Sequence, residues 1–65
     1  MRLTVFWERM NGRFGAAYAD SLSRDLVLAS LSGRTVHEAL DAGVEPAVVW
    51  HAVCDAVDVP AHERH

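Results

Sequence analysis

The segment from residue 35 to residue 50 constrains the fold of this chain most strongly, because it carries the signals that end one helix and begin the next. Thr35 and Glu38 have the spacing of a capping box, in which each side chain accepts a hydrogen bond from the other residue's backbone amide. Gly43 can adopt the backbone conformation that ends a helix, and Pro46 suits the first position of the following one. The sequence therefore predicts a helix-turn-helix-like hairpin over about residues 35–57.

Two more helices are predicted before this hairpin. Apolar residues that recur at intervals of three and four fall on one stripe of a helix: Leu3, Phe6, Trp7, Met10 and Phe14. Thr4 is its expected N-cap and Gly15 its expected end. Residues 16–31 are predicted to form a second helix that is apolar on two faces, and Asp20 and Arg24 are predicted to form an exposed pair on it. No segment alternates like a strand, so we predict an all-α fold, a compact bundle of three to four short helices.

The last helix is predicted to begin at Pro46 and to stop before Val59 and Pro60. Its inward stripe is expected to consist of Val49, Ala52, Val53 and Ala56, while Trp50 and Cys54 share a different face. Beyond Pro60 there is no periodic pattern. We therefore predict a single helical domain over residues 1–59 and a flexible C-terminal tail over residues 60–65.

Size and charge restrict the function. A chain of 65 residues forms one small domain with a thin stability margin. The net charge of −3 argues against a general polyanion binder, although all six basic residues are Arg and could act locally. Cys54 is the single cysteine, which fits a reducing compartment, and there is no signal region or membrane-spanning run. We expect a cytoplasmic protein that does not bind membranes.

Two surfaces are candidates for binding a partner protein. Trp50, with Ala47 and Cys54 nearby, could form an exposed aromatic patch, or Trp50 could pack into the core instead. Arg2, Arg9 and Arg13 lie close together in angle on the first helix and form a basic strip, which could equally be an ordinary solvated face. The main hypothesis is a non-enzymatic interaction or regulatory module, present as a monomer or weak homodimer.

The alternative hypothesis is a DNA-associated regulator that uses the hairpin. Its candidate nucleic-acid contacts are Arg9, Arg13, Arg34 and His51. The outward residues at the start of the last helix do not favour it, because base readout uses Arg, Lys, Asn and Gln, and Glu45 would repel phosphate. Nucleic acid is thus a possible but not a favoured partner.

No catalytic site, cofactor or metal site is predicted. His51, Cys54, His62 and His65 have a spacing that could suit zinc, but a single thiolate and two histidines in the tail make a structural site improbable. A nucleophilic Cys54 with His51 as its base lacks a third group to orient the histidine. We therefore expect that the chain is not an enzyme.

Taken together, motifs along most of the chain resemble DUF family 3046, a small actinobacterial family of unknown function. The motifs are Met1-Arg2-Leu3-Thr4, Phe6-Trp7-Glu8-Arg9-Met10, Phe14-Gly15, Tyr18-Ala19, Gly33-Arg34-Thr35-Val36, Ala39-Leu40, Gly43, Pro46, Val49-Trp50 and Ala52-Val53-Cys54. The resemblance fades after about Pro60, and it implies that the chain is a complete protein. It supplies no catalytic residues. This chain departs from the family pattern at Val5, where an acidic residue is common, and at His51, where a basic residue is common.

Overall fold

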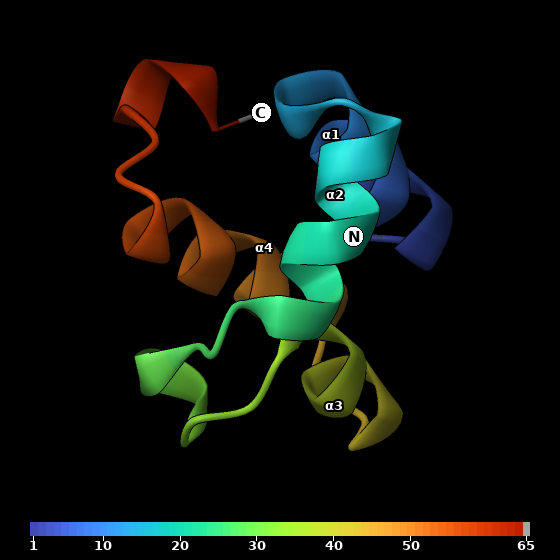
Figure 1. Ribbon diagram of the computed structural model, residues 1–65, viewed down its shortest axis with the longest axis vertical. Helices are drawn as coiled ribbons and strands as arrows, with labels where there is room; N and C mark the ends of the chain where they lie inside the picture. The colour runs from blue at the N-terminus through green and yellow to red at the C-terminus, as the bar shows by residue number, and fades with distance from the viewer. Residues whose placement is uncertain (65) are drawn as a thin grey trace.

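The computed structural model describes residues 1–64, which form four α-helices and two 3-10 turns, with no strand among them (Figure 1). The elements are α1 (Leu3–Phe14), α2 (Ala16–Asp25), η1 (Ala29–Leu31), α3 (Val36–Asp41), α4 (Pro46–Ala56) and η2 (Ala61–Glu63). The molecule measures 25 × 21 × 21 Å along its principal axes. The all-α bundle predicted from the sequence is confirmed.

The first helix ends at the predicted place but begins earlier than predicted, with a different N-cap. Thr4 lies inside α1, whose N-cap is Arg2, and the Arg2 side chain makes no capping hydrogen bond. The helix starts earlier than predicted because the amide of Phe6, a core residue, donates to the carbonyl oxygen of Arg2 at 3.0 Å. Gly15 separates α1 from α2 with φ 84° and ψ 145°, an extended conformation with positive φ that side chains disfavour.

The second helix is shorter than predicted. It ends at Asp25, residues 26–28 are not helical, and η1 follows, whereas the sequence predicted one helix over residues 16–31. A continuous helix would place Leu28 about two and a half turns from the buried Ala19, on the opposite side. The break instead turns Leu28 into the core, where it has no exposed surface. The predicted pair of Asp20 and Arg24 is present at 3.3 Å.

The helical hairpin forms as its capping signals predicted. Thr35 Oγ1 accepts from the Glu38 amide at 3.2 Å, and Glu38 Oε1 accepts from the Thr35 amide at 2.9 Å, so both halves of the capping box are made. Gly43, with φ 87°, lies in the turn after α3, and Pro46 is the first residue of α4. The two helices pack against each other.

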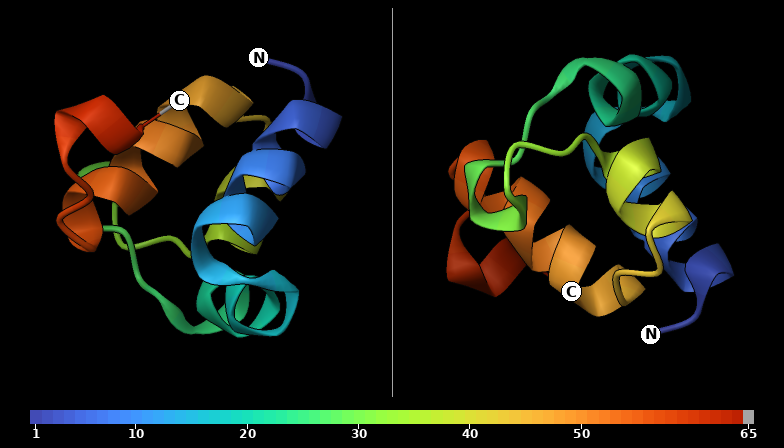
Figure 2. Two further views of the ribbon diagram at one scale, coloured as in Figure 1. Left: turned by 90° about the horizontal axis from the view of Figure 1, so that it is seen from above. Right: turned by 90° about the horizontal axis from the view of Figure 1, so that it is seen from below.

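The core is built around α4, which packs against α1, α3 and η1. The buried apolar residues are Phe6, Met10, Ala19, Leu22, Leu28, Val36, Ala39, Val49, Trp50, Ala52, Val53, Cys54 and Val59. Ala56, predicted to face inward, is exposed, so the inward stripe ends one turn earlier than expected. The N-terminal ends of α1 and α4 lie close together, and the Met1 ammonium is 3.2 Å from Glu45 Oε1 (Figure 2).

The C-terminal residues fold back beside α4 rather than extending away from it (Figure 2). Val59 is buried, and its amide donates to the carbonyl oxygen of Cys54 at 2.9 Å. Residues 61–63 form η2, and Arg64 contacts both α4 and Val59. The sequence predicted a flexible tail over residues 60–65. Residues 60–64 have defined contacts in this structure, and His65 lies outside the described residues.

The two threonines near helix starts give a matched test of the capping box. Thr35→Ala removes an N-cap acceptor and should lower the free energy of unfolding by about 1 kcal/mol. Thr4→Ala, inside α1, should change it by less than about 0.5 kcal/mol. Urea denaturation of the two variants and the wild type measures both values. Equal losses would contradict the assignment of the cap to Thr35.

Candidate functional site

Trp50 is a core residue with 1% of its surface exposed. Its indole N–H donates to the carbonyl oxygen of Arg64 at 2.8 Å, which satisfies the one polar atom of the side chain. Cys54 has no exposed surface and Ala47 is half-buried. The exposed patch that the sequence allowed for these three residues is therefore absent, because the C-terminal segment covers this side of α4.

The basic strip lies along α1 as predicted. Arg2 and Arg13 are exposed and Arg9 is half-buried. Arg13 Nη1 is 3.2 Å from Glu63 Oε1, and these two side chains are 37% and 41% exposed. Within residues 1–64, no ion pair involves Arg2 or Arg9. Two of the three guanidinium groups therefore have no acidic partner in this part of the chain.

A shallow groove of about 460 Å³ brings the strip and Trp50 together. Val5, Glu8, Arg9, Gly12 and Arg13 of α1 line it, together with Trp50 of α4 and Glu63 of η2. Gly12 has no other group within 4 Å of the position that a Cβ would occupy, so α1 is open there. We call this depression the α1/α4 groove. It combines two guanidinium groups and two carboxylates with the almost completely buried side chain of Trp50.

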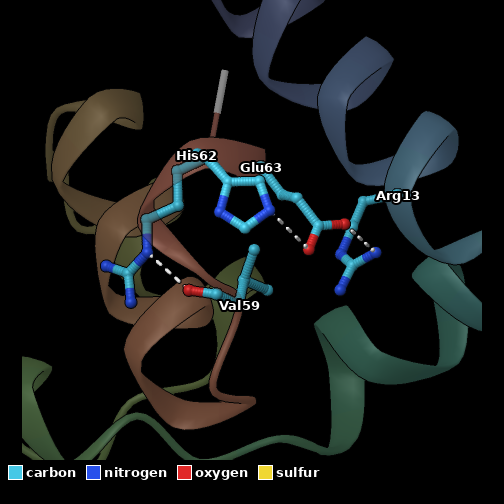
Figure 3. Close-up of polar contacts among 5 residues, drawn as sticks. Arg13, Val59, His62 and Glu63 are labelled. Atoms are coloured by element: carbon cyan, nitrogen blue, oxygen red, sulfur yellow. Dashed lines mark hydrogen bonds and ion pairs between the residues drawn. The ribbon is translucent and has the colours of Figure 1, made fainter.

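Glu63 and Arg64 were missed by sequence reasoning, although they complete one end of this groove. Glu63 pairs with Arg13, and His62 Nε2 lies 3.7 Å from Glu63 Oε2 (Figure 3). Arg64 donates from Nε to the Val59 carbonyl oxygen at 2.8 Å and from Nη1 to Asp55 at 2.7 Å. No pattern in the sequence marks these contacts, because the Glu63–Arg13 pair joins residues 50 apart and the Arg64 contacts depend on how the chain turns after α4.

Cys54 has no exposed surface, and burial raises the pKa of its thiol above the usual value of 9.0. The charge of Arg64 opposes this shift, Asp55 adds to it, and Arg13 and Arg9 oppose it. The three arginines come from α1 and the C-terminal segment. The thiol is therefore fully covered yet close to charged groups at the surface.

The residues proposed for DNA contact do not converge. Arg9 and Arg13 line the α1/α4 groove, whereas Arg34 follows η1, where its carbonyl oxygen accepts from the Leu28 amide at 2.8 Å. His51 is exposed on α4 and does not line the groove. The structure therefore brings two of the four candidates together with Trp50 and leaves the other two apart from that groove.

Residues 1–64 contain no cluster of three or more histidine, cysteine, aspartate or glutamate side chains that could hold a metal ion. Of the four residues with zinc-like spacing, His51 is exposed, Cys54 is buried, and His65 lies outside the described residues. In the same range, no helix has both the length and the apolar character needed to cross a membrane.

Comparison with known proteins finds one family. The sequence model of the family described as "Protein of unknown function (DUF3046)" matches residues 1–62. No curated protein and no solved structure matches the chain. The matched residues include the four α-helices and both guanidinium groups of the α1/α4 groove, whereas Glu63 and Arg64 lie beyond them.

Replacement of the two tryptophans should distinguish a core indole from a half-buried one. Trp50→Phe removes the hydrogen bond to Arg64 and leaves a small void, so the free energy of unfolding should fall by about 2 kcal/mol. Trp7→Phe, at a half-buried position, should cost about 1 kcal/mol or less. Chemical denaturation measures both. A Trp50→Phe protein as stable as the wild type would contradict the observed burial.

The raised pKa of Cys54 predicts a loss of stability in alkali. Above pH 9.0 the unfolded chain releases the thiol proton while the folded chain retains it, so rising pH favours unfolding. The free energy of unfolding should therefore fall more steeply from about pH 8 to about pH 10 in the wild type than in Cys54→Ala. Urea titrations across this range give both slopes. Parallel slopes would show that the thiol titrates alike in both states.

Proposed function

Because this chain belongs to the DUF3046 family, whose function is unknown, we propose from its surface that it is a non-enzymatic interaction module that binds an acidic segment of a partner protein. The binding surface is the basic strip of Arg2, Arg9 and Arg13 beside the α1/α4 groove. We further propose that the protein acts as a monomer or weak homodimer in the cytoplasm, where its free thiol would stay reduced.

The observation that carries this proposal is that two guanidinium groups of one strip lack acidic partners, whereas the third such group of residues 1–64, that of Arg34, lies away from the strip. Arg2 and Arg9 make no ion pair within residues 1–64, although the chain has a net charge of −3. A guanidinium group forms two parallel hydrogen bonds with a carboxylate and so favours acidic side chains. The strip therefore offers a partner two guanidinium groups without acidic partners beside the α1/α4 groove.

Exposed apolar side chains near one end of the strip favour a protein partner. Met1 and Leu3 at the start of α1 are 37% and 49% exposed, and Val48 in α4 is 48% exposed. The Met1–Glu45 ion pair brings the two helix starts together. Apolar surface beside charged groups is typical of protein interfaces, whereas DNA backbones chiefly offer phosphates.

The DNA-associated regulator remains the second proposal, since α3 and α4 form a short helical hairpin. The exposed side of α4 argues against it, because Val48, His51 and Asp55 include no arginine or lysine. Glu45, which precedes the helix, accepts from the Ala47 amide and would present a negative charge to phosphate. Partner capture should therefore depend on α1 and not on α4.

Matched charge variants test the proposal. Arg2→Gln with Arg9→Gln removes two positive charges from the strip, and Arg24→Gln with Arg34→Gln removes the same charge elsewhere. A partner captured from extract by the immobilised full chain, and identified by mass spectrometry, should be recovered at least about tenfold less with the strip variant. The control variant should recover it at the wild-type level.

Two results would contradict the proposal. Equal recovery by both variants would remove the strip from the interface. A low-salt gel shift of duplex DNA that weakens steeply with salt and is lost in the strip variant would instead favour the DNA-associated regulator.

A further inference from the structure

We infer that residues 60–64 are a displaceable strap that occupies the Arg13 and Trp50 end of the α1/α4 groove, and that an acidic partner segment takes its place. This inference rests on the proposed function and adds a regulatory contact to it. It identifies the chemistry of the partner from the contacts that the strap itself makes.

The strap covers apolar residues without adding apolar residues to the core. Val59 is the last buried side chain of the described chain; residues 60–63 are exposed and Arg64 is half-buried. The side chain of Trp50, whose indole N–H donates to the Arg64 carbonyl oxygen, is almost completely covered, and so is that of Cys54 one turn further along α4. Because this segment buries none of its own apolar side chains, its detachment from the surface withdraws no apolar side chain from the core.

Two of the bonds that hold the strap are exposed ion pairs, which solvent or a partner can replace. Arg13 and Glu63 are 37% and 41% exposed, so their attraction is screened by water. Arg64 bonds to Asp55 at 2.7 Å, and the Asp55 side chain is also largely exposed. Exposed ion pairs add little to stability, so local opening of the strap costs far less than unfolding of the domain.

The strap makes the two contacts that a ligand at this site would make. The Glu63 carboxylate meets the Arg13 guanidinium at 3.2 Å, and the carbonyl oxygen of the next residue, Arg64, accepts from the Trp50 indole at 2.8 Å. A partner segment with an acidic residue followed by any residue has both groups in the same order. The buried indole N–H favours such an occupant, because it needs an acceptor once the strap has left.

Displacement also changes the charge of the groove. With the strap in place, the groove is lined by Glu8 and Glu63 and by Arg9 and Arg13, which balance. Departure of Glu63 leaves two guanidinium groups against one carboxylate, and the Arg13 guanidinium is free to bind. The open groove therefore attracts an acidic segment more strongly than the closed groove does.

The thiol of Cys54 reports opening in the full chain. Arg64→Ala removes the bonds of the strap to Asp55 and Val59 while it keeps the backbone carbonyl group. Reaction of Cys54 with Ellman's reagent should be at least about fivefold faster than in the wild type, because the strap spends a larger fraction of the time detached. The Arg64 charge favours the thiolate, so its loss by itself would slow the reaction, and a faster reaction reports exposure.

Arg24→Ala is the matched control, since it breaks an exposed ion pair with Asp20 far along the chain from the strap. Its labelling rate should match the wild type. Glu63→Gln provides a second variant and should also increase the rate. The increased rates should be insensitive to low urea, as local opening requires. Unchanged labelling rates in both strap variants would contradict local opening of the strap. Labelling rates that rise with urea as steeply as global unfolding would also contradict it.

A hexaglutamate peptide, with hexaglutamine as its control, tests the occupant. In Arg64→Ala the acidic peptide should protect Cys54 from labelling and bind at least about fivefold more tightly than to the wild type. Equal binding to both proteins would overturn competition by the strap while leaving the proposed function standing. If the acidic peptide binds neither protein, an acidic segment is not the occupant of the groove. The labelling rates would still decide whether the strap opens. Protection that grows with protein concentration and without peptide would assign the site to a second copy of the chain instead.

Discussion

Burial of α4 on two sides is the constraint on which the rest of this structure depends. Val49 and Val53 form part of the core that α4 shares with its neighbouring helices, while Trp50 lies at the groove beside α1 and bonds to the C-terminal segment. A 65-residue chain has little apolar surface to bury, so it gains most by surrounding a single apolar helix. The break after α2, the fold of the C-terminal segment and the position of α1 all contribute to that enclosure.

This enclosure places the charged groups of the chain unevenly. Arg13, Arg24 and Arg64 each pair with an acidic side chain, whereas Arg2 and Arg9 do not within residues 1–64. Arg34 also makes no ion pair in that range, but it lies between η1 and α3. Arg9 instead lines the α1/α4 groove, where the Trp50 indole donates to the C-terminal segment. Apolar burial thus brings the Trp50 indole and the basic strip together, although neither forms a binding surface by itself.

Local signals allowed several elements to be predicted from the sequence. The capping box of Thr35 and Glu38, the turn at Gly43 and the start of α4 at Pro46 depend on residues within a few positions of one another. The end of α2 did not follow from such signals, because residues 26–31 have an apolar pattern that a helix could also accommodate. The break is favoured by burial of Leu28 in the core, which depends on tertiary packing, and by the backbone hydrogen bond from the Leu28 amide to Arg34.

The sequence by itself determined the helical class, the hairpin of α3 and α4, and the common stripe of Arg2, Arg9 and Arg13, since these follow from helical periodicity and local caps. Tertiary structure alone decided that Trp50 is buried, that Cys54 is covered, and that Glu63 and Arg64 contact Arg13 and α4. The physical reason is the distance along the chain: periodicity reports which side chains share a face, but the partner of each face depends on how distant segments enclose the core.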